Sequence, residues 1–204
     1  MLYSRLTFCD HISHITSKAS KTLGFVFRAS KHFRDIYCIK AIYCALVRSI
    51  LEYASIVWSP YYQNSIRRIE AVQHKFVKFS LRHLPWSDPT NLPSYEQRCK
   101  LIALDLLCDR RNVAEISFIS DLLQSHVDCP ELLRQINLNI RLRNLRSHNF
   151  LQIPFSRTNY GFNEPMSSMC REFNRYCFSF DFNLSRTVLR KRYTSAIKST
   201  LWLI

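Results

Sequence analysis

Apolar residues recur every three or four positions in three stretches near the start of the chain. This spacing places them on one face of a helix, so it predicts helices over about 13–31, 36–58 and 65–84. The third stretch has its apolar stripe at Ile66, Ile69, Val72, Phe76 and Phe79. The connections between these stretches are short, which is typical of helices packed as an antiparallel bundle.

Further along, the helical pattern continues in shorter pieces. Residues 85–93 are rich in proline and predict a linker. Ser94 followed by Gln97 forms a capping-box pattern that predicts the start of another helix. A break near 103–105 precedes a longer helix to about 125, and Pro130 begins a short helix that ends near 136.

The pattern changes after residue 136. Residues 136–140 and 150–155 alternate between apolar and polar side chains, which predicts two short strands. Pro165 begins a helix to about 178, and Ser185 caps a last helix. The predicted fold is mainly α, with a helical bundle, a second helical region and a small β-hairpin. The predicted domains are a three-helix bundle over 1–88, a helical connection over 89–136 and a basic C-terminal region over 137–204.

Composition narrows the class of protein. Apolar residues make up 47% of the chain and aromatic residues 13%, which is enough to bury a core. Only two glycines occur, which excludes the glycine-rich loops that cradle nucleotide phosphates. The eight cysteines include no Cys-x-x-Cys pair, so we expect buried or half-buried thiols in a reducing compartment, with Cys38, Cys44, Cys99, Cys108, Cys170 and Cys177 in helices.

The start of the chain has no apolar core of a secretion signal, and no apolar run is long enough to span a membrane. We therefore expect an intracellular protein, nuclear or cytoplasmic, that does not enter a membrane.

Charge points to a polyanionic partner. The chain has 29 Lys and Arg against 15 Asp and Glu, a net charge of +14. Cations clustered among aromatic residues bind phosphates and can stack bases, and Tyr160 and Tyr193 lie beside two of the clusters. The alternative is an ordinary solvated surface. The predicted nucleic-acid-binding residues are Arg67, Arg68, Lys75, Lys78, Arg82, Arg141, Arg143, Arg146, Arg157, Arg190, Lys191 and Arg192.

Sites for metal or nucleophilic chemistry are not indicated. Cys9, His11 and His14 have zinc-ligand side chains, but a structural zinc needs four ligands and no partner pair follows nearby. No Gly-x-Ser-x-Gly nucleophile elbow is present. We therefore predict no catalytic residue and no metal site in this chain.

Several segments resemble one family in order and spacing. The strongest is LVRSILEYASIVWSP at 46–60 followed by IRRIEAVQHKF at 66–76. Others are HISHITSKASKTLGFVFR at 11–28, YEQRCKLIALDLLCDRRNVAEISFI at 95–119, CPELL at 129–133 and RTNYGFNEPMSSMCREFNRY at 157–176. Together they resemble the region downstream of the polymerase core in reverse transcriptases of jockey-like non-LTR retrotransposons. The resemblance implies that the first helices correspond to the thumb, which grips the template–primer duplex.

The resemblance also shows what this chain lacks. The family's catalytic palm holds two Mg²⁺ ions with clustered aspartates, as two-metal phosphoryl transfer requires. Here no two acidic residues are adjacent. We therefore expect no RNA-directed DNA polymerase activity and no cofactor in this chain, because Mg²⁺ belongs to the palm of the parent enzyme. The implied partners are RNA or an RNA–DNA duplex, together with the missing palm domain.

Two other interpretations remain open. One is a helical module for protein–protein interaction, including self-association through apolar helix faces that a palm would otherwise cover. The other is a remnant of a transposable element without a function. Binding that is insensitive to salt would favour the first over nucleic-acid recognition.

Overall fold

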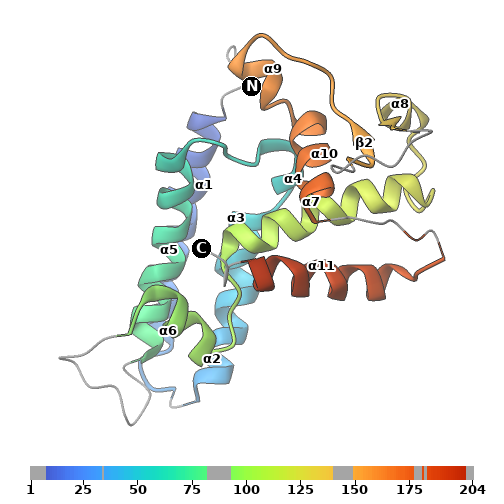
Figure 1. Ribbon diagram of the computed structural model, residues 1–204. Helices are drawn as coiled ribbons and strands as arrows, with labels where there is room; N and C mark the ends of the chain where they lie inside the picture. The colour runs from blue at the N-terminus through green and yellow to red at the C-terminus, as the bar shows by residue number, and fades with distance from the viewer. Residues whose placement is uncertain are drawn as a thin grey trace. The chain divides into compact units, whose positions relative to one another are not determined.

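The chain folds as two compact units, Met1–Cys108 and Asp109–Ile204 (Figure 1). The computed structural model describes residues 8–33, 35–81, 93–139, 149–176, 181 and 183–200. These residues are mainly helical and include one two-stranded antiparallel sheet. The predicted fold class, mainly α with a small β-hairpin, is therefore confirmed.

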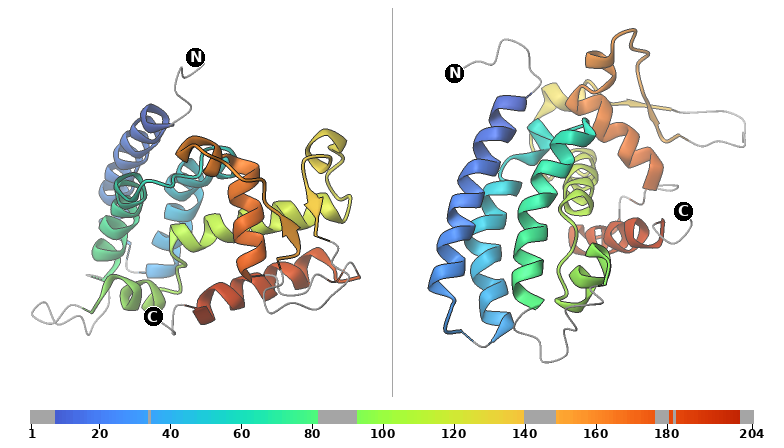
Figure 2. Two further views of the ribbon diagram at one scale, coloured as in Figure 1. Left: turned by 45° about the horizontal axis from the view of Figure 1, so that its top comes forward. Right: turned by 90° about the vertical axis from the view of Figure 1, so that its left-hand side faces the viewer.

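Three helical rods lie side by side in the first unit (Figure 2, right). Two of them are α1 (Cys9–Ala29) and α5 (Gln63–Leu81). The third, called the middle rod, is made of α2 (Ile36–Tyr43), a π-helical turn (Cys44–Arg48) and α3 (Ser49–Glu52). The middle rod runs opposite to α1 and α5, which gives the expected antiparallel arrangement. The apolar stripes meet in one core that contains Ala19, Leu23, Ile39, Tyr43, Val47, Ile69 and Phe76.

The middle rod ends earlier than its apolar spacing predicts. Ala54 takes a left-handed backbone conformation, with φ of 50°, and α4 (Ser55–Trp58) is a separate turn. The indole nitrogen of Trp58 donates a hydrogen bond to the carbonyl of Tyr53 at 2.8 Å, while the amide of Val57 donates to Ala54 at 3.0 Å. The prediction of one helix over 36–58 is therefore wrong, because these bonds replace the helical ladder after Glu52.

The capping box at Ser94 is confirmed. The Ser94 hydroxyl accepts from the amide of Gln97 at 3.3 Å, and the Gln97 side chain accepts from the amide of Ser94 at 2.9 Å. These bonds begin α6 (Tyr95–Leu101). Ala103, with φ of 50°, then separates α6 from α7 (Leu107–Leu123) at the predicted break.

The first unit continues beyond the predicted domain boundary at residue 88. Residues 82–92 lie outside the described part, but α6 packs on α5 after them. Cys99, Ile102, Leu104 and Leu107 are buried in the same core as the bundle. The helix after the linker thus completes the bundle, and the compact unit ends at Cys108.

The second unit joins most of α7 to several short elements. These are α8 (Pro130–Leu133), β1 (Asn137–Leu138), β2 (Leu151–Gln152), α9 (Asn159–Phe162), α10 (Pro165–Tyr176) and α11 (Arg186–Thr200). The two predicted strands are present but short, with Leu138 opposite Leu151. Helix α9 is a single turn that contains Gly161. Asn174 on α10 accepts from the amide of Leu151 at 2.9 Å and donates to its carbonyl at 2.8 Å, so it holds β2 against the helix.

The thiols follow the predicted pattern in part. Cys99 and Cys170 are buried, and burial raises the pKa of each to about 11, so both are unreactive thiols at neutral pH. Cys44 and Cys108 are half-buried. Cys38 is exposed, contrary to prediction, because it lies on the outer side of α2. Cys177 lies outside the described residues.

No helix within the described residues has the length and apolar character needed to cross a membrane.

Candidate nucleic-acid interface

The outer side of α5 carries the first predicted basic cluster. Arg67, Arg68, Lys75 and Lys78 are all exposed. Glu70, three residues after Arg67, is the one carboxylate in α5, and it is half-buried. It accepts hydrogen bonds from the Tyr95 hydroxyl at 2.9 Å and from the amide of Cys108 at 2.8 Å. These bonds engage both oxygens of Glu70, while the four cations of α5 stay exposed.

A shallow groove lies between α1 and α5, with a volume of about 280 Å³. Arg68 and Lys75 line it from α5, with Ala71 and Val72 between them. The side of α1 contributes only hydroxyl side chains, those of Ser13, Thr16, Ser17 and Ser20. The lining has no carboxylate, so the groove combines positive charge with hydrogen-bonding groups. That combination suits a phosphate-containing ligand.

The two edges of the groove match in length. Arg68 and Lys75 are seven residues apart on α5, and Ser13 and Ser20 are seven apart on α1. The two helices run in the same direction (Figure 2, right). A rise of 1.5 Å per residue makes each edge about 10 Å long. Along the axis of a duplex, where each strand carries a phosphate about every 3.4 Å, that length corresponds to about three base-pair steps.

The opposite side of α5 is fixed by a polar network. The Tyr43 hydroxyl donates to the side chain of Gln73 at 3.1 Å, and Gln73 donates to the carbonyl of Asp105 at 3.0 Å. Both side chains are buried, and the Tyr43 ring also stacks on Phe76 with 3.9 Å between centroids. This network sets the rotation of α5, so it determines which side chains face outward.

His74 links α5 to α6. Its Nε2 lies 2.9 Å from a guanidinium nitrogen of Arg98. Arg98 has no acceptor, so this nitrogen of His74 must be the acceptor and the ring must be neutral. Partial burial lowers the pKa of His74 from its ordinary value of 6.5, and the nearby positive charges of Arg98 and Lys78 lower it further. Tyr95 lies edge-on to the ring at 5.1 Å, and Glu70 is already bonded to Tyr95.

This contact predicts a loss of stability in mild acid. Because the pKa of His74 is lower in the folded state, its contribution to stability is present above about pH 6.5 and is lost as the pH falls through the folded-state value. We expect the wild type to lose more stability between pH 7.5 and pH 5 than His74→Gln, whose amide oxygen can accept from Arg98 without titrating. Denaturant unfolding at several pH values measures this difference, and identical pH profiles would contradict it.

The C-terminal basic cluster is also exposed. Helix α11 buries Leu189, Tyr193 and Ile197. Arg190, Lys191 and Arg192 are exposed on the same helix. Tyr193, however, cannot stack on a base, because it is only 2% exposed and its hydroxyl lies 2.8 Å from that of Ser120. The prediction of a stacking role for Tyr193 is therefore wrong, since its ring belongs to the core of the second unit.

The remaining predicted residues divide into two groups. Arg157 is exposed, three residues before Tyr160, which is 51% exposed. Arg82, Arg141, Arg143 and Arg146 lie outside the described residues. The two predicted clusters that the structure describes most fully are therefore those of α5 and α11, and the α5 cluster borders a groove.

The serine edge of the groove was missed from the sequence. Ser13, Ser17 and Ser20 are spaced by four and three residues, so they follow one side of α1. The sequence therefore shows that these serines form a row on one side of α1. It does not show that the row lines a groove, because the groove exists only where α5 lies beside α1.

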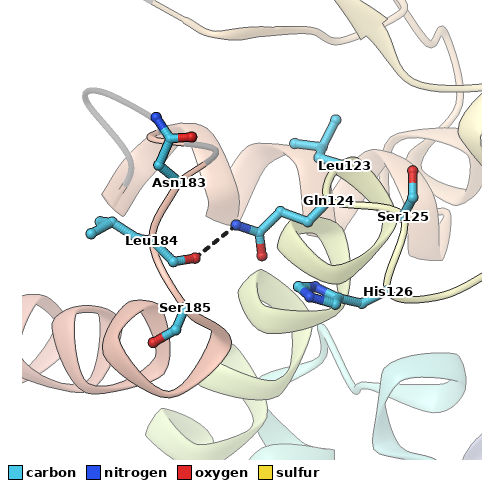
Figure 3. Close-up of a pocket in the computed structure, with 7 residues that line it drawn as sticks. All are labelled: Leu123, Gln124, Ser125, His126, Asn183, Leu184 and Ser185. Carbon is cyan, nitrogen blue, oxygen red and sulfur yellow. Dashed lines mark hydrogen bonds between the residues drawn. The ribbon is translucent and has the colours of Figure 1, made fainter.

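The second unit contains a polar pocket of about 430 Å³ between the end of α7 and the start of α11 (Figure 3). Gln124 points across it and donates a hydrogen bond to the carbonyl of Leu184 at 2.9 Å. Next to it, Arg186 pairs with the buried carboxylate of Asp121 at 2.7 Å, and His126 lies 3.9 Å from the same side chain. These contacts join the two helices, so they help to orient the cations of α11.

Metal-binding side chains are not gathered in the described part of the chain. No three His, Cys, Asp or Glu residues there come together as ligands. In the Cys9, His11 and His14 segment, Cys9 and His14 are exposed, and His11 packs its ring against Trp58 at 5.3 Å. Packing against Trp58 gives His11 a structural role.

Comparison with known proteins gives no match. No protein family, curated protein or solved structure is significantly similar to this chain.

Proposed function

We propose that this chain binds RNA or an RNA–DNA duplex through phosphate contacts, with little dependence on sequence. The observation that carries the proposal is the groove between α1 and α5, in which Arg68 and Lys75 face a row of hydroxyl groups without any carboxylate. The net charge of +14 supports the same partner. Aromatic side chains do not line the groove, so contacts there favour the backbone of the strand over its bases.

The resemblance to jockey-like reverse transcriptases gives this proposal a context. In that context the bundle of α1, α2–α3 and α5 corresponds to the thumb, and the rest of the chain to the region downstream of it. We propose a binding role without polymerase activity, since the carboxylates of this sequence are scattered singly and the palm is the part that would hold Mg²⁺. The palm of the parent enzyme is then a second proposed partner.

The test is a salt titration of binding. The full chain is mixed with a fluorescently labelled RNA strand and with an RNA–DNA duplex, and anisotropy is measured at increasing salt. Each neutralised phosphate contributes about −0.7 on a single strand, or about −0.9 on a B-form duplex, to the slope of log affinity against log salt. We expect a slope of about −3 or steeper, because several exposed cations take part. Absence of binding at low salt, or a flat slope, would refute the proposal.

A second candidate function rests on exposed apolar side chains. Along the middle rod and α4, Tyr37 is 74% exposed, Leu46 44%, Tyr53 81% and Val57 56%. Exposed apolar residues of this size can take part in protein binding. A protein-interaction module, or a chain that self-associates through these residues, would therefore explain their exposure. Oligomers that form regardless of salt, without RNA binding, would favour this candidate.

A further inference from the structure

We propose that the groove between α1 and α5 selects the ribose–phosphate backbone of RNA over the deoxyribose–phosphate backbone of DNA. This inference rests on the proposed function and extends it by naming the sugar that the groove recognises. It follows from the state of the hydroxyl protons on the α1 side.

Two of the four hydroxyl groups that line the groove from α1 already donate their protons within the helix. The Ser13 hydroxyl donates to the carbonyl of Cys9 at 2.8 Å, and the Thr16 hydroxyl donates to the carbonyl of Ile12 at 2.7 Å. A hydroxyl has one proton and two lone pairs, so while these bonds are kept each of these oxygens can only accept a further hydrogen bond. Thr16 is 8% exposed, which leaves Ser13 as the fixed acceptor that a ligand can reach.

A fixed acceptor distinguishes the two backbones. The phosphates and sugar of a DNA strand offer only acceptor oxygens, whereas the 2′-hydroxyl of RNA is both donor and acceptor. Bound DNA would displace the water that donates a hydrogen bond to the Ser13 oxygen. It could not replace that bond, because its backbone offers only acceptors. Bound RNA can donate a 2′-hydroxyl to Ser13. A hydroxyl that is itself donating is also a better acceptor, because hydrogen bonds in a chain polarise one another.

The other groups of the groove fit the same strand. Arg68 and Lys75 bind phosphate oxygens on the α5 edge. Ser17 and Ser20 face the sugar edge and can either donate or accept. Ala71 and Val72 provide an apolar floor against the sugar carbons. A strand would thus lie along the groove with its phosphates toward α5 and its 2′-hydroxyls toward α1.

The experiment compares three single strands of the same base sequence. One is RNA, one is DNA, and one is 2′-fluoro RNA, which keeps a ribose-like sugar shape but has no 2′ donor. Affinities for the wild type are measured by anisotropy at one low salt concentration. We expect RNA to bind about fivefold tighter than DNA, the factor given by about one additional net hydrogen bond. The 2′-fluoro strand should bind like DNA, because it too cannot donate.

The matched variant is Ser13→Ala with Ser17→Ala and Ser20→Ala. Alanine has the highest helix propensity, so these substitutions should preserve α1. The variant should bind RNA and DNA equally and keep the salt slope of the wild type. The control is Thr22→Ala with Ser49→Ala, which removes two hydroxyls that donate to helical carbonyls outside the groove and should leave the preference for RNA intact.

The possible outcomes distinguish a failure of this inference from a failure of the proposed function. Equal affinity of the wild type for RNA and DNA, with a steep salt slope, would overturn the selection of ribose and leave the proposed function standing. Tight binding of the 2′-fluoro strand would overturn the role of the 2′ donor in the same way. Failure to bind any of the three strands would overturn both proposals.

Discussion

Replacing Arg68 and Lys75 together with alanine should weaken RNA binding about tenfold or more at low salt. These two cations line the groove, and among the described residues no carboxylate pairs with either of them. Their charge is therefore available to phosphates. Two phosphate contacts worth about 0.7 kcal/mol each correspond to a factor of ten in affinity. Because both side chains are exposed, the fold should be unaffected.

The control for net charge is Lys18→Ala with Lys21→Ala. Both lysines are exposed on α1 in the same unit, and neither lines the groove. The control lowers the net charge of the chain by the same two units, so it has the same long-range effect on a polyanion. We expect a loss of affinity of about threefold or less, since charges away from the contact act only through a screened field. Equal losses in the two variants would show that net charge, and not the groove, determines binding.

Replacing Phe76 with alanine should be the most destabilising single change in the first unit. Phe76 is fully buried, and its ring stacks on Tyr43 with 3.9 Å between centroids and an angle of 9° between the planes. Removing a buried phenylalanine ring costs about 3–5 kcal/mol, through lost burial and the cavity that remains. The ring lies where α2 meets α5, so the loss falls on the contact that holds the middle rod against the groove-forming helix.

Thermal unfolding followed by circular dichroism measures this effect in the full chain. We expect the transition of the first unit to fall by about 12 °C or more, given about 4–8 °C per kcal/mol for a unit of this size. Phe25→Ala is the matched control, because the same ring is removed from α1 at a position that is 57% exposed. It should shift the transition by a few degrees at most. Similar shifts in the two variants would contradict the assignment of Phe76 to the core.

Local rules in the sequence predict most of the helices. The Ser94 and Gln97 capping box depends on residues three apart, so it could be recognised without knowledge of the fold. The apolar stripe of α5 is equally local, and Ile69, Val72 and Phe76 are buried as predicted. The end of the middle rod is different. The bond from the Trp58 indole to the Tyr53 carbonyl depends on side-chain packing that apolar spacing does not reveal.

Only one side of the candidate site, that of α5, could be predicted from the sequence. The cations of α5 stand out in the sequence because their charges are dense and lie off the apolar stripe. The serines of α1 carry no such signal, since Ser13 and Ser20 acquire a role only where α1 lies beside Arg68 and Lys75. Tyr193 shows the reverse error. Its neighbours in sequence suggested nucleic acid, but its position on α11 places it in the core.

The most direct test of the central claim is a salt titration of RNA binding by the wild type and the Arg68→Ala, Lys75→Ala variant side by side. If the groove binds phosphates, the wild type should give a steep negative slope of log affinity against log salt. The variant's slope should be shallower by about 1.4, which is two contacts at about 0.7 each on a single strand. Two parallel lines, or two flat ones, would contradict the account.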